Sequence, residues 1–241
     1  IKNNRCVGAE ALLRWPGFDD PVMSPAEFIP LAENSGMIAQ VTDYVVDELF
    51  NDLGEYLARH PQLYIAINLS ASDFHSARLI AQITEKARSY AVCVKQIKIE
   101  VTERGFIDVP KTTPVIQAFR EAGYEIAIDD FGTGYSNLHN LYSLNVDILK
   151  IDKSFIDTLT TNSTSHLIAE HIIDMARSLR LKTIAEGVET LDQVDWLLKR
   201  GVQFCQGWHF ARAMPPQEFM QWLAKSPILL RTPHDGRQAE I

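Results

Sequence analysis

Two adjacent aspartates, Asp129 and Asp130, stand between an apolar run and a glycine-containing loop in the stretch "YEIAIDDFGTGYSNL". Other strand-like runs also end in an acid, an amide or an ammonium group: Asn68, Glu100, Lys150, Glu186 and Gln206. In a parallel barrel the carboxyl ends of the strands meet at one rim, where catalytic groups converge. Any one of these residues alone would be interpreted as a solvated loop residue. Because they recur in phase, we expect them to form one site.

The run "GAEALLRW" adds two charged residues to this set. Side chains alternate between the faces of a strand, so Glu10, Leu12 and Arg14 are expected on one face. An internal ion pair between Glu10 and Arg14 is one interpretation. The other is a metal ligand beside a phosphate clamp, since a guanidinium group matches phosphate oxygens in pairs.

The candidate ligands offer only oxygen: Glu10, Asn68, Glu100, Asp129, Asp130 and Glu186. Such a set suits Mg²⁺ or Mn²⁺ better than Zn²⁺ or Cu²⁺. Carboxylates crowded on one rim repel one another, and two cations about 3.5 to 4 Å apart would relieve that repulsion. We therefore predict two ions, with Asp129 bridging them and Asp130 binding the second.

Composition indicates a single globular domain over residues 1–241, with 46% hydrophobic residues and a formal net charge of −8. The negative charge argues against binding of polymeric nucleic acid, which requires clustered Lys and Arg. The cysteines Cys6, Cys93 and Cys205 have no CxxC spacing, and no apolar run approaches the roughly 20 residues of a membrane span. We expect a cytoplasmic domain with a core over about residues 7–223 and a peripheral tail over 227–241.

Strand-like runs alternate with amphipathic helical stretches, which is typical of a parallel sheet wrapped by helices. Strands are expected at 7–15, 63–69, 97–101, 125–129, 146–151, 182–186 and 202–206. Helices are expected to begin at Ser24-Pro25-Ala26-Glu27 and end near Gly36, and then at 39–59, 77–90, 113–122, 165–179, 191–199 and 216–224. This pattern is one strand short of a closed (β/α)8 barrel. An open doubly wound sheet is the rival.

The chain resembles the EAL domain family, the bacterial phosphodiesterases of cyclic di-GMP, from about Val7 to Leu223. The resemblance lies in the ordered motifs "GAEALLRW", "NLS", "IEVTE", "DDFGTGYSNL", "LKID", "AEGVE" and "CQGWHFARAMP". It implies a modified (β/α)8 barrel of the TIM type with one antiparallel strand. That first strand would precede the sequence, whose "YQP" segment is missing here.

The resemblance also implies roles for individual residues. Metal ligands would be Glu10, Asn68, Glu100 and Asp129 for one ion, and Asp129 and Asp130 for the other. Catalytic residues would be Lys150 beside the attacking water, Glu186 as general base or as a ligand through water, and Glu189 as a helper of the metal-bound waters. Substrate contacts would be Leu12, Arg14, Asp130 and Gln206, and Glu103 would anchor the loop Phe131 to Ser136.

The expected activity is hydrolysis of cyclic di-GMP to linear pGpG by two Mg²⁺ or Mn²⁺ ions, with Ca²⁺ as an inhibitor. A homodimer is expected, without membrane contact by this domain, inside a larger sensor protein that could itself be membrane-anchored. A non-hydrolysing cyclic di-GMP receptor is one alternative, although it would require damaged ligand positions. An enolase-like Mg²⁺ barrel is the other, but it does not explain the paired aspartates or Arg14.

Overall fold

Seven parallel strands form one curved sheet, ordered β1 to β7 as in the chain. The computed structural model describes residues 5–15, 23–73, 77–102, 109–133, 144–159 and 165–225. The strands are β1 (Gly8–Ala11), β2 (Tyr64–Leu69), β3 (Ile97–Thr102), β4 (Glu125–Phe131), β5 (Ile148–Ile151), β6 (Lys182–Ala185) and β7 (Phe204–Cys205). Each strand pairs in parallel with the next.

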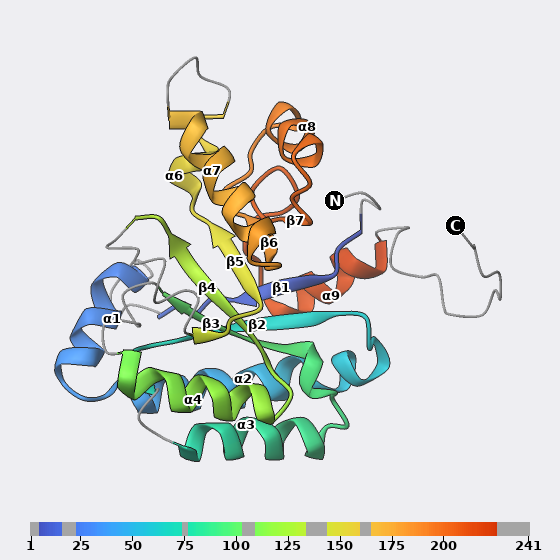
Figure 1. Ribbon diagram of the computed structural model, residues 1–241. Helices are drawn as coiled ribbons and strands as arrows, with labels where there is room; N and C mark the ends of the chain where they lie inside the picture. The colour runs from blue at the N-terminus through green and yellow to red at the C-terminus, as the bar shows by residue number, and fades with distance from the viewer. Residues whose placement is uncertain are drawn as a thin grey trace, which may run out of the picture.

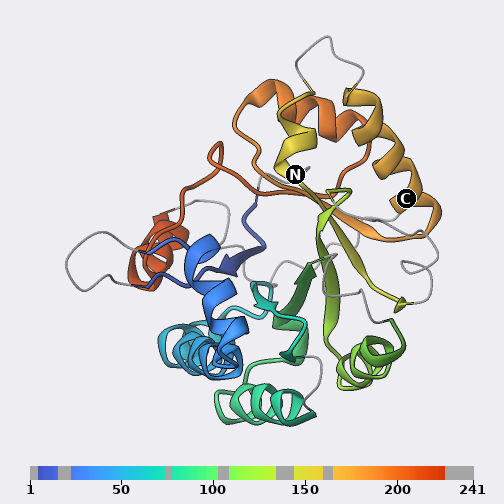
Figure 2. The same ribbon diagram turned by 90° about the vertical axis from the view of Figure 1, so that its left-hand side faces the viewer.

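Helices surround the outside of this sheet (Figures 1 and 2). They are α1 (Pro25–Asn34), α2 (Ile38–Arg59), α3 (Ala77–Ser89), α4 (Val109–Glu121), α6 (Lys153–Ile156), α7 (Ser165–Ser178), α8 (Leu191–Lys199) and α9 (Pro216–Lys225), with a 3-10 turn at Val94–Gln96. Figure 1 shows α2, α3 and α4 along one flank and α7 and α8 on another. None of the helices in the described part of the chain is long and apolar enough to cross a membrane.

The sheet curls until its two edges approach each other. The Gln206 side chain, just beyond β7, donates a hydrogen bond from Nε2 to Glu10 Oε2 of β1 at 2.8 Å. The Lys150 side chain on β5 also reaches Glu10, with Nζ 3.5 Å from Oε2. These contacts span the inside of a barrel, so the barrel-type fold is confirmed and the doubly wound sheet is wrong. The antiparallel strand remains a prediction.

The first long connection follows the local signals in the sequence. The Ser24 side chain accepts a hydrogen bond from Ala26 N at 3.3 Å, and the Glu27 side chain accepts one from Ser24 N at 3.2 Å. This reciprocal capping satisfies backbone donors that a helix end leaves open. Gly36 ends the turn after α1 with a φ of +73°. Both predicted signals are confirmed.

Two local predictions are corrected by the structure. The strand expected to reach Trp15 ends at Ala11, where its pairing with Ile67 of β2 ends. Trp15 instead forms an isolated antiparallel bridge with Met23 and packs its ring 5.6 Å from that of Phe28. Tertiary pairing therefore overrides the alternation of "LLRW". The helix expected from Thr113 begins earlier, at Val109, and α6 was not expected at all.

The barrel interior is layered along the strand axis. At the amino end, Lys98 Nζ lies 3.0 Å from Glu125 Oε2 and 3.8 Å from the centre of the Tyr64 ring, while Lys182 Nζ lies 2.5 Å from Glu125 Oε1. A small apolar layer of Ala127, Ile148 and Ile184 follows, with Phe204 packed against it. Because side chains alternate by two residues, the next layer up contains the strand-end polar groups.

Candidate metal and catalytic site

Lys150 is the centre of the carboxyl-end layer and is completely buried. Its Nζ lies 2.6 Å from Glu100 Oε2, 2.7 Å from Glu186 Oε1, 3.0 Å from Asp129 Oδ1 and 3.5 Å from Glu10 Oε2. These partners come from strands β1, β3 and β4 and from the end of β6. The structure thus brings most of the predicted strand-end residues together around one ammonium group.

Amide side chains complete the ring around Glu10. Asn68 Nδ2 donates to Glu10 Oε1 at 2.5 Å, and Gln206 Nε2 donates to Glu10 Oε2 at 2.8 Å. Glu10 therefore has a hydrogen-bond donor on each oxygen in addition to the charge of Lys150. The adjacency of Asn68 and Glu10 follows from strand pairing, since the register sets Glu10 opposite Ala66 and one alternation step from Asn68.

The charges in this layer do not balance. Burial disfavours the ammonium of Lys150, but the surrounding carboxylates, Glu100 first, outweigh it and raise the pKa of Lys150 well above its ordinary value. Burial and the neighbouring acids raise the pKa of Glu100 to about 8, although Lys150 opposes this shift. Glu186 behaves in the same way, with a pKa of about 8. One cation is too few for the acids gathered here.

Glu10 is the exception among these acids. Burial raises its pKa, but Lys150 and the hydrogen bonds from Asn68 and Gln206 outweigh burial, so the pKa of Glu10 is lowered. Hydrogen bonds to the charged form stabilise that form. Glu10 is therefore held as a carboxylate, which is the form that binds a metal ion.

Two sets of carboxylates are spaced for metal binding among the described residues. Glu10, Glu100 and Asp129 each offer an oxygen within 4.8 Å of the others, and so do Asp129, Asp130 and Glu186. Both sets contain only oxygen donors, which fits a hard divalent cation. Asp129 belongs to both sets, as expected for a bridging ligand. The residues present therefore fit a pair of ions, and their individual roles remain predictions.

A bulge in β4 explains how two adjacent aspartates serve the same site. In a regular strand, neighbouring side chains point to opposite faces. The register between β4 and β5 shifts between Ile128 and Phe131, and Asp130 has a φ of +54°. Its amide donates to Asp129 Oδ1 at 3.0 Å. A positive φ at a residue other than glycine is strained, so this strain occurs where both carboxylates are needed.

Several predicted residues lie apart from this cluster. Leu12 and Arg14 follow the end of β1 and are exposed, and Arg14 Nη1 donates to the carbonyl of Leu13 at 3.0 Å. Their predicted position on a strand face is wrong, because the strand ends before them. Glu189 pairs with Lys153, with 2.8 Å between its Oε1 and Nζ. Glu103, and with it most of the loop that it would anchor, lies outside the described residues.

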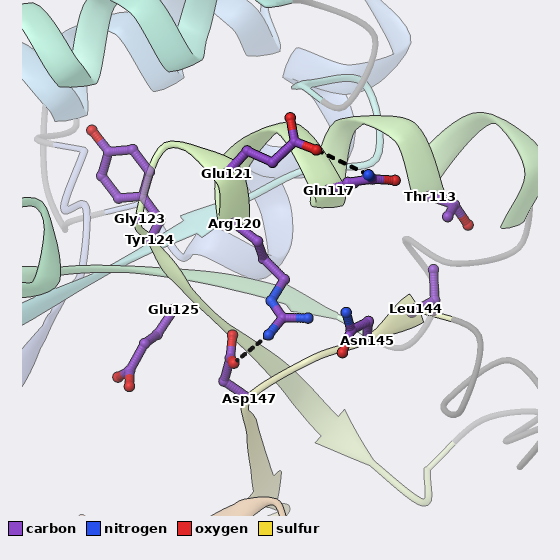
Figure 3. Close-up of a pocket in the computed structure, with 10 residues that line it drawn as sticks. All are labelled: Thr113, Gln117, Arg120, Glu121, Gly123, Tyr124, Glu125, Leu144, Asn145 and Asp147. Carbon is purple, nitrogen blue, oxygen red and sulfur yellow. Dashed lines mark hydrogen bonds and ion pairs between the residues drawn. The ribbon is translucent and has the colours of Figure 1, made fainter.

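A separate pocket of about 600 Å³ lies beside α4 and the start of β4 and β5 (Figure 3). Its wall includes Arg120, whose Nη2 lies 3.1 Å from Asp147 Oδ1. Glu125 at the first position of β4 lines it, whereas Asp129 of the metal sets is near the other end of that strand. The pocket is therefore at the amino end of the strands and takes no part in the candidate site.

The comparisons agree with this geometry. The family described as "EAL domain" matches residues 1–213. The chain is 44% identical over 222 residues to "Probable cyclic di-GMP phosphodiesterase PdeB" of Escherichia coli (strain K12), covering 92% of this chain and 42% of that protein. It is 34% identical over 226 residues to "Cyclic di-GMP phosphodiesterase PA2567" of Pseudomonas aeruginosa, covering 93% of this chain and 38% of that protein.

Among solved structures, "PaMucR Phosphodiesterase, c-di-GMP complex" superposes with a TM-score of 0.83 at 36% identity, covering 90% of this chain and 89% of that one. The chain spans less than half the length of the two relatives named above. A family match over most of the chain, together with the shared fold and the strand-end motifs, leads to one conclusion: this chain belongs to the EAL domain family.

Proposed function

We propose that this domain hydrolyses one phosphodiester bond of cyclic di-GMP to give linear pGpG. The observation that carries the proposal is the cluster around Lys150, in which two carboxylate sets share Asp129. The names of the relatives and of the solved neighbour support the substrate. A receptor that had lost hydrolysis would not need this ligand set to be intact.

The residues of the chain would divide the work between binding and chemistry. Asn68 and Gln206 orient Glu10 by the hydrogen bonds described above. Lys150 holds four acids around one point, and Glu186 next to it would accept the proton of the attacking water. Arg14 and Leu12 are exposed beyond β1 and would contact the substrate, and Glu189 would assist once its pairing with Lys153 allows.

The metal ions are proposed to be Mg²⁺ or Mn²⁺, two per site. Glu10, Asn68, Glu100 and Asp129 would hold one, and Asp129, Asp130 and Glu186 the other. When bound, the ions would neutralise the carboxylates and make water a stronger nucleophile. The chain's own contribution is to hold the acids at fixed spacing in a buried layer.

Incubation of the purified protein with cyclic di-GMP and Mg²⁺ or Mn²⁺ tests this function, with pGpG followed by chromatography and binding by calorimetry. We expect product with either ion and none after chelation with EDTA. Tight binding without product would contradict hydrolysis and favour the receptor. Absence of both binding and product would reject this substrate.

Two wider properties are also proposed. We expect a homodimer at micromolar concentration, which sedimentation would detect; a monomer with full specific activity would contradict a functional role for the dimer. We also propose a cytoplasmic location within a longer sensor protein, because the relatives extend well beyond the matched region. Fractionation of cells that produce the full-length protein would test the location.

A further inference from the structure

The short helix α6 lies between the two loops that carry the second carboxylate set. It begins two residues after the end of β5, and β5 lies between β4 and β6 in the sheet. Asp129 and Asp130 belong to the end of β4, and Glu186 directly follows β6. Any side chain of α6 that contacts both neighbouring loops can therefore determine how far apart these acids lie.

Lys153 contacts the loop after β6 in two ways. Gly187, next to Glu186, has a φ of +63°, and a Cβ added there would lie 2.3 Å from Lys153 Cγ. The stem of Lys153 thus occupies the space that any other residue at position 187 would need. Its Nζ lies 2.8 Å from Glu189 Oε1 and 2.7 Å from Asp157 Oδ1. The loop is therefore held by close packing at one residue and by an ion pair two residues further on.

Phe155 makes the matching contact with the loop after β4. Gly132, two residues after Asp130, has a φ of +96°, and a Cβ added there would lie 2.9 Å from Phe155 Cε2. The same loop is tied back to Asp130, whose carbonyl accepts a hydrogen bond from Thr133 Oγ1 at 2.9 Å. A glycine with left-handed backbone thus rests against an α6 side chain on each side of β5.

Gln193 fixes the far end of the β6 loop to the same helix. This side chain is 4% exposed, and its Oε1 accepts from Glu189 N at 2.8 Å and from Thr190 N at 3.0 Å. Its Nε2 donates to the carbonyl of Ile156, the last residue of α6, at 3.2 Å. The loop from Glu186 to Thr190 is therefore attached to α6 at both of its ends.

We propose that α6 is a spacer that sets the distance between Asp130 and Glu186, with Lys153 and Phe155 as positioning residues of the second metal site. This inference rests on the proposed function for its biological meaning but concerns metal binding itself. Residues that orient metal ligands typically change affinity by about 10- to 100-fold when they are replaced. The first carboxylate set, apart from the shared Asp129, lies on β1 and β3, away from α6, so the effect should be selective.

Titration of the substrate-free protein with Mn²⁺ tests the proposal, because the electron paramagnetic resonance signal of free Mn²⁺ counts the bound ions. Wild type should bind two. In Lys153→Ala and Phe155→Ala, one ion should bind as in wild type, while the other should need about 10- to 100-fold more Mn²⁺. If Lys153→Ala does not fold, Lys153→Met keeps the stem against Gly187 and is judged by the same criterion.

Lys86→Met is the matched control. Lys86 also forms an exposed ion pair, 2.9 Å from Asp47 Oδ1, but it joins α3 to α2. Its Mn²⁺ titration should equal that of wild type. The proposal is overturned if the folded α6 variants bind both ions as wild type does, if both ions weaken equally, or if wild type binds a single ion. Failure of wild type to hydrolyse cyclic di-GMP would instead reject the proposed function and leave the Mn²⁺ result in force.

Discussion

The two ends of the barrel interior both carry charged side chains, but they treat charge differently. At the amino end, Glu125 lies between Lys98 and Lys182, within 3.0 Å and 2.5 Å of their ammonium groups. Burial raises the pKa of Glu125, but the two lysines outweigh burial and lower it. This layer has its counter-charges in place and needs no further ligand.

At the carboxyl end the proportions are reversed, with one ammonium group among several acids. The pKa of Glu100 and that of Glu186 are each raised to about 8, burial first and neighbouring acids next. A buried charge is tolerated when it is paired or bound to metal. The comparison teaches that a layer with excess carboxylates is arranged for cations, whereas a balanced layer closes the barrel floor.

The largest effect expected from this comparison is on turnover. Glu186→Gln keeps size and removes the negative charge, so kcat should fall by about 10²- to 10⁴-fold, the usual range for a lost acid or base, with little change in KM. Steady-state kinetics with cyclic di-GMP would measure both. Glu125→Gln at the other end serves as the control and should retain the turnover of folded wild type. Near wild-type kcat in Glu186→Gln would remove its assigned role.

The choice of ion should separate binding from catalysis. Ca²⁺ prefers six to eight ligands at about 2.3 to 2.6 Å, against roughly 2.0 to 2.1 Å for Mg²⁺. We expect Ca²⁺ to permit cyclic di-GMP binding, to support no turnover, and to inhibit the Mg²⁺ reaction by competition. Calorimetry and chromatography would follow the two steps. Full turnover with Ca²⁺ alone would show that ligand spacing does not govern this site.

The carboxyl-end layer should also set the pH dependence of stability when EDTA removes divalent ions. Glu100 and Glu186 have ordinary pKa values of 4.5 and folded values of about 8. Between these values the folded state binds more protons than the unfolded state. Their contribution is therefore present below about pH 4.5 and is lost as pH rises through 8.

Urea unfolding across this pH range would measure that loss. The pKa of Lys150 is raised above 10.5, so its own contribution stays constant in the same window. Glu100→Gln should flatten the curve, because one of the two titrating acids is gone, while Glu125→Gln should not. A slope that is unchanged in Glu100→Gln would mean that other groups dominate the linkage.

The smallest effect is expected from the balanced layer. Lys98→Met removes one of the two partners of Glu125 but leaves Lys182, so we expect a loss of about 1 to 3 kcal/mol in the free energy of unfolding. Mn²⁺ dependence and kcat of the folded variant should equal those of wild type. A shifted Mn²⁺ requirement would show that the two layers are coupled through the apolar layer between them.

The strand-end chemistry could be predicted from the sequence because period-two alternation and the carboxyl-end rule act locally. Glu100, Lys150 and Glu186 were expected at one rim, and they meet within 2.7 Å of one Nζ or at that Nζ itself. Capping at Ser24 was predictable for the same reason, since its hydrogen bonds span three residues. Helix and strand ends shifted by a few residues where tertiary pairing, as at Ala11, decided them.

Other features depended on contacts between distant segments. The bulge that turns Asp129 and Asp130 to the same site is a shift against β5, and α6 is defined by what Gly132 and Gly187 leave room for. Thus the sequence by itself determined which side chains the rim contains, because strand alternation needs only neighbours in the chain. Only the tertiary structure decided how far apart they lie, because spacing depends on packing between strands and loops that the chain brings together late.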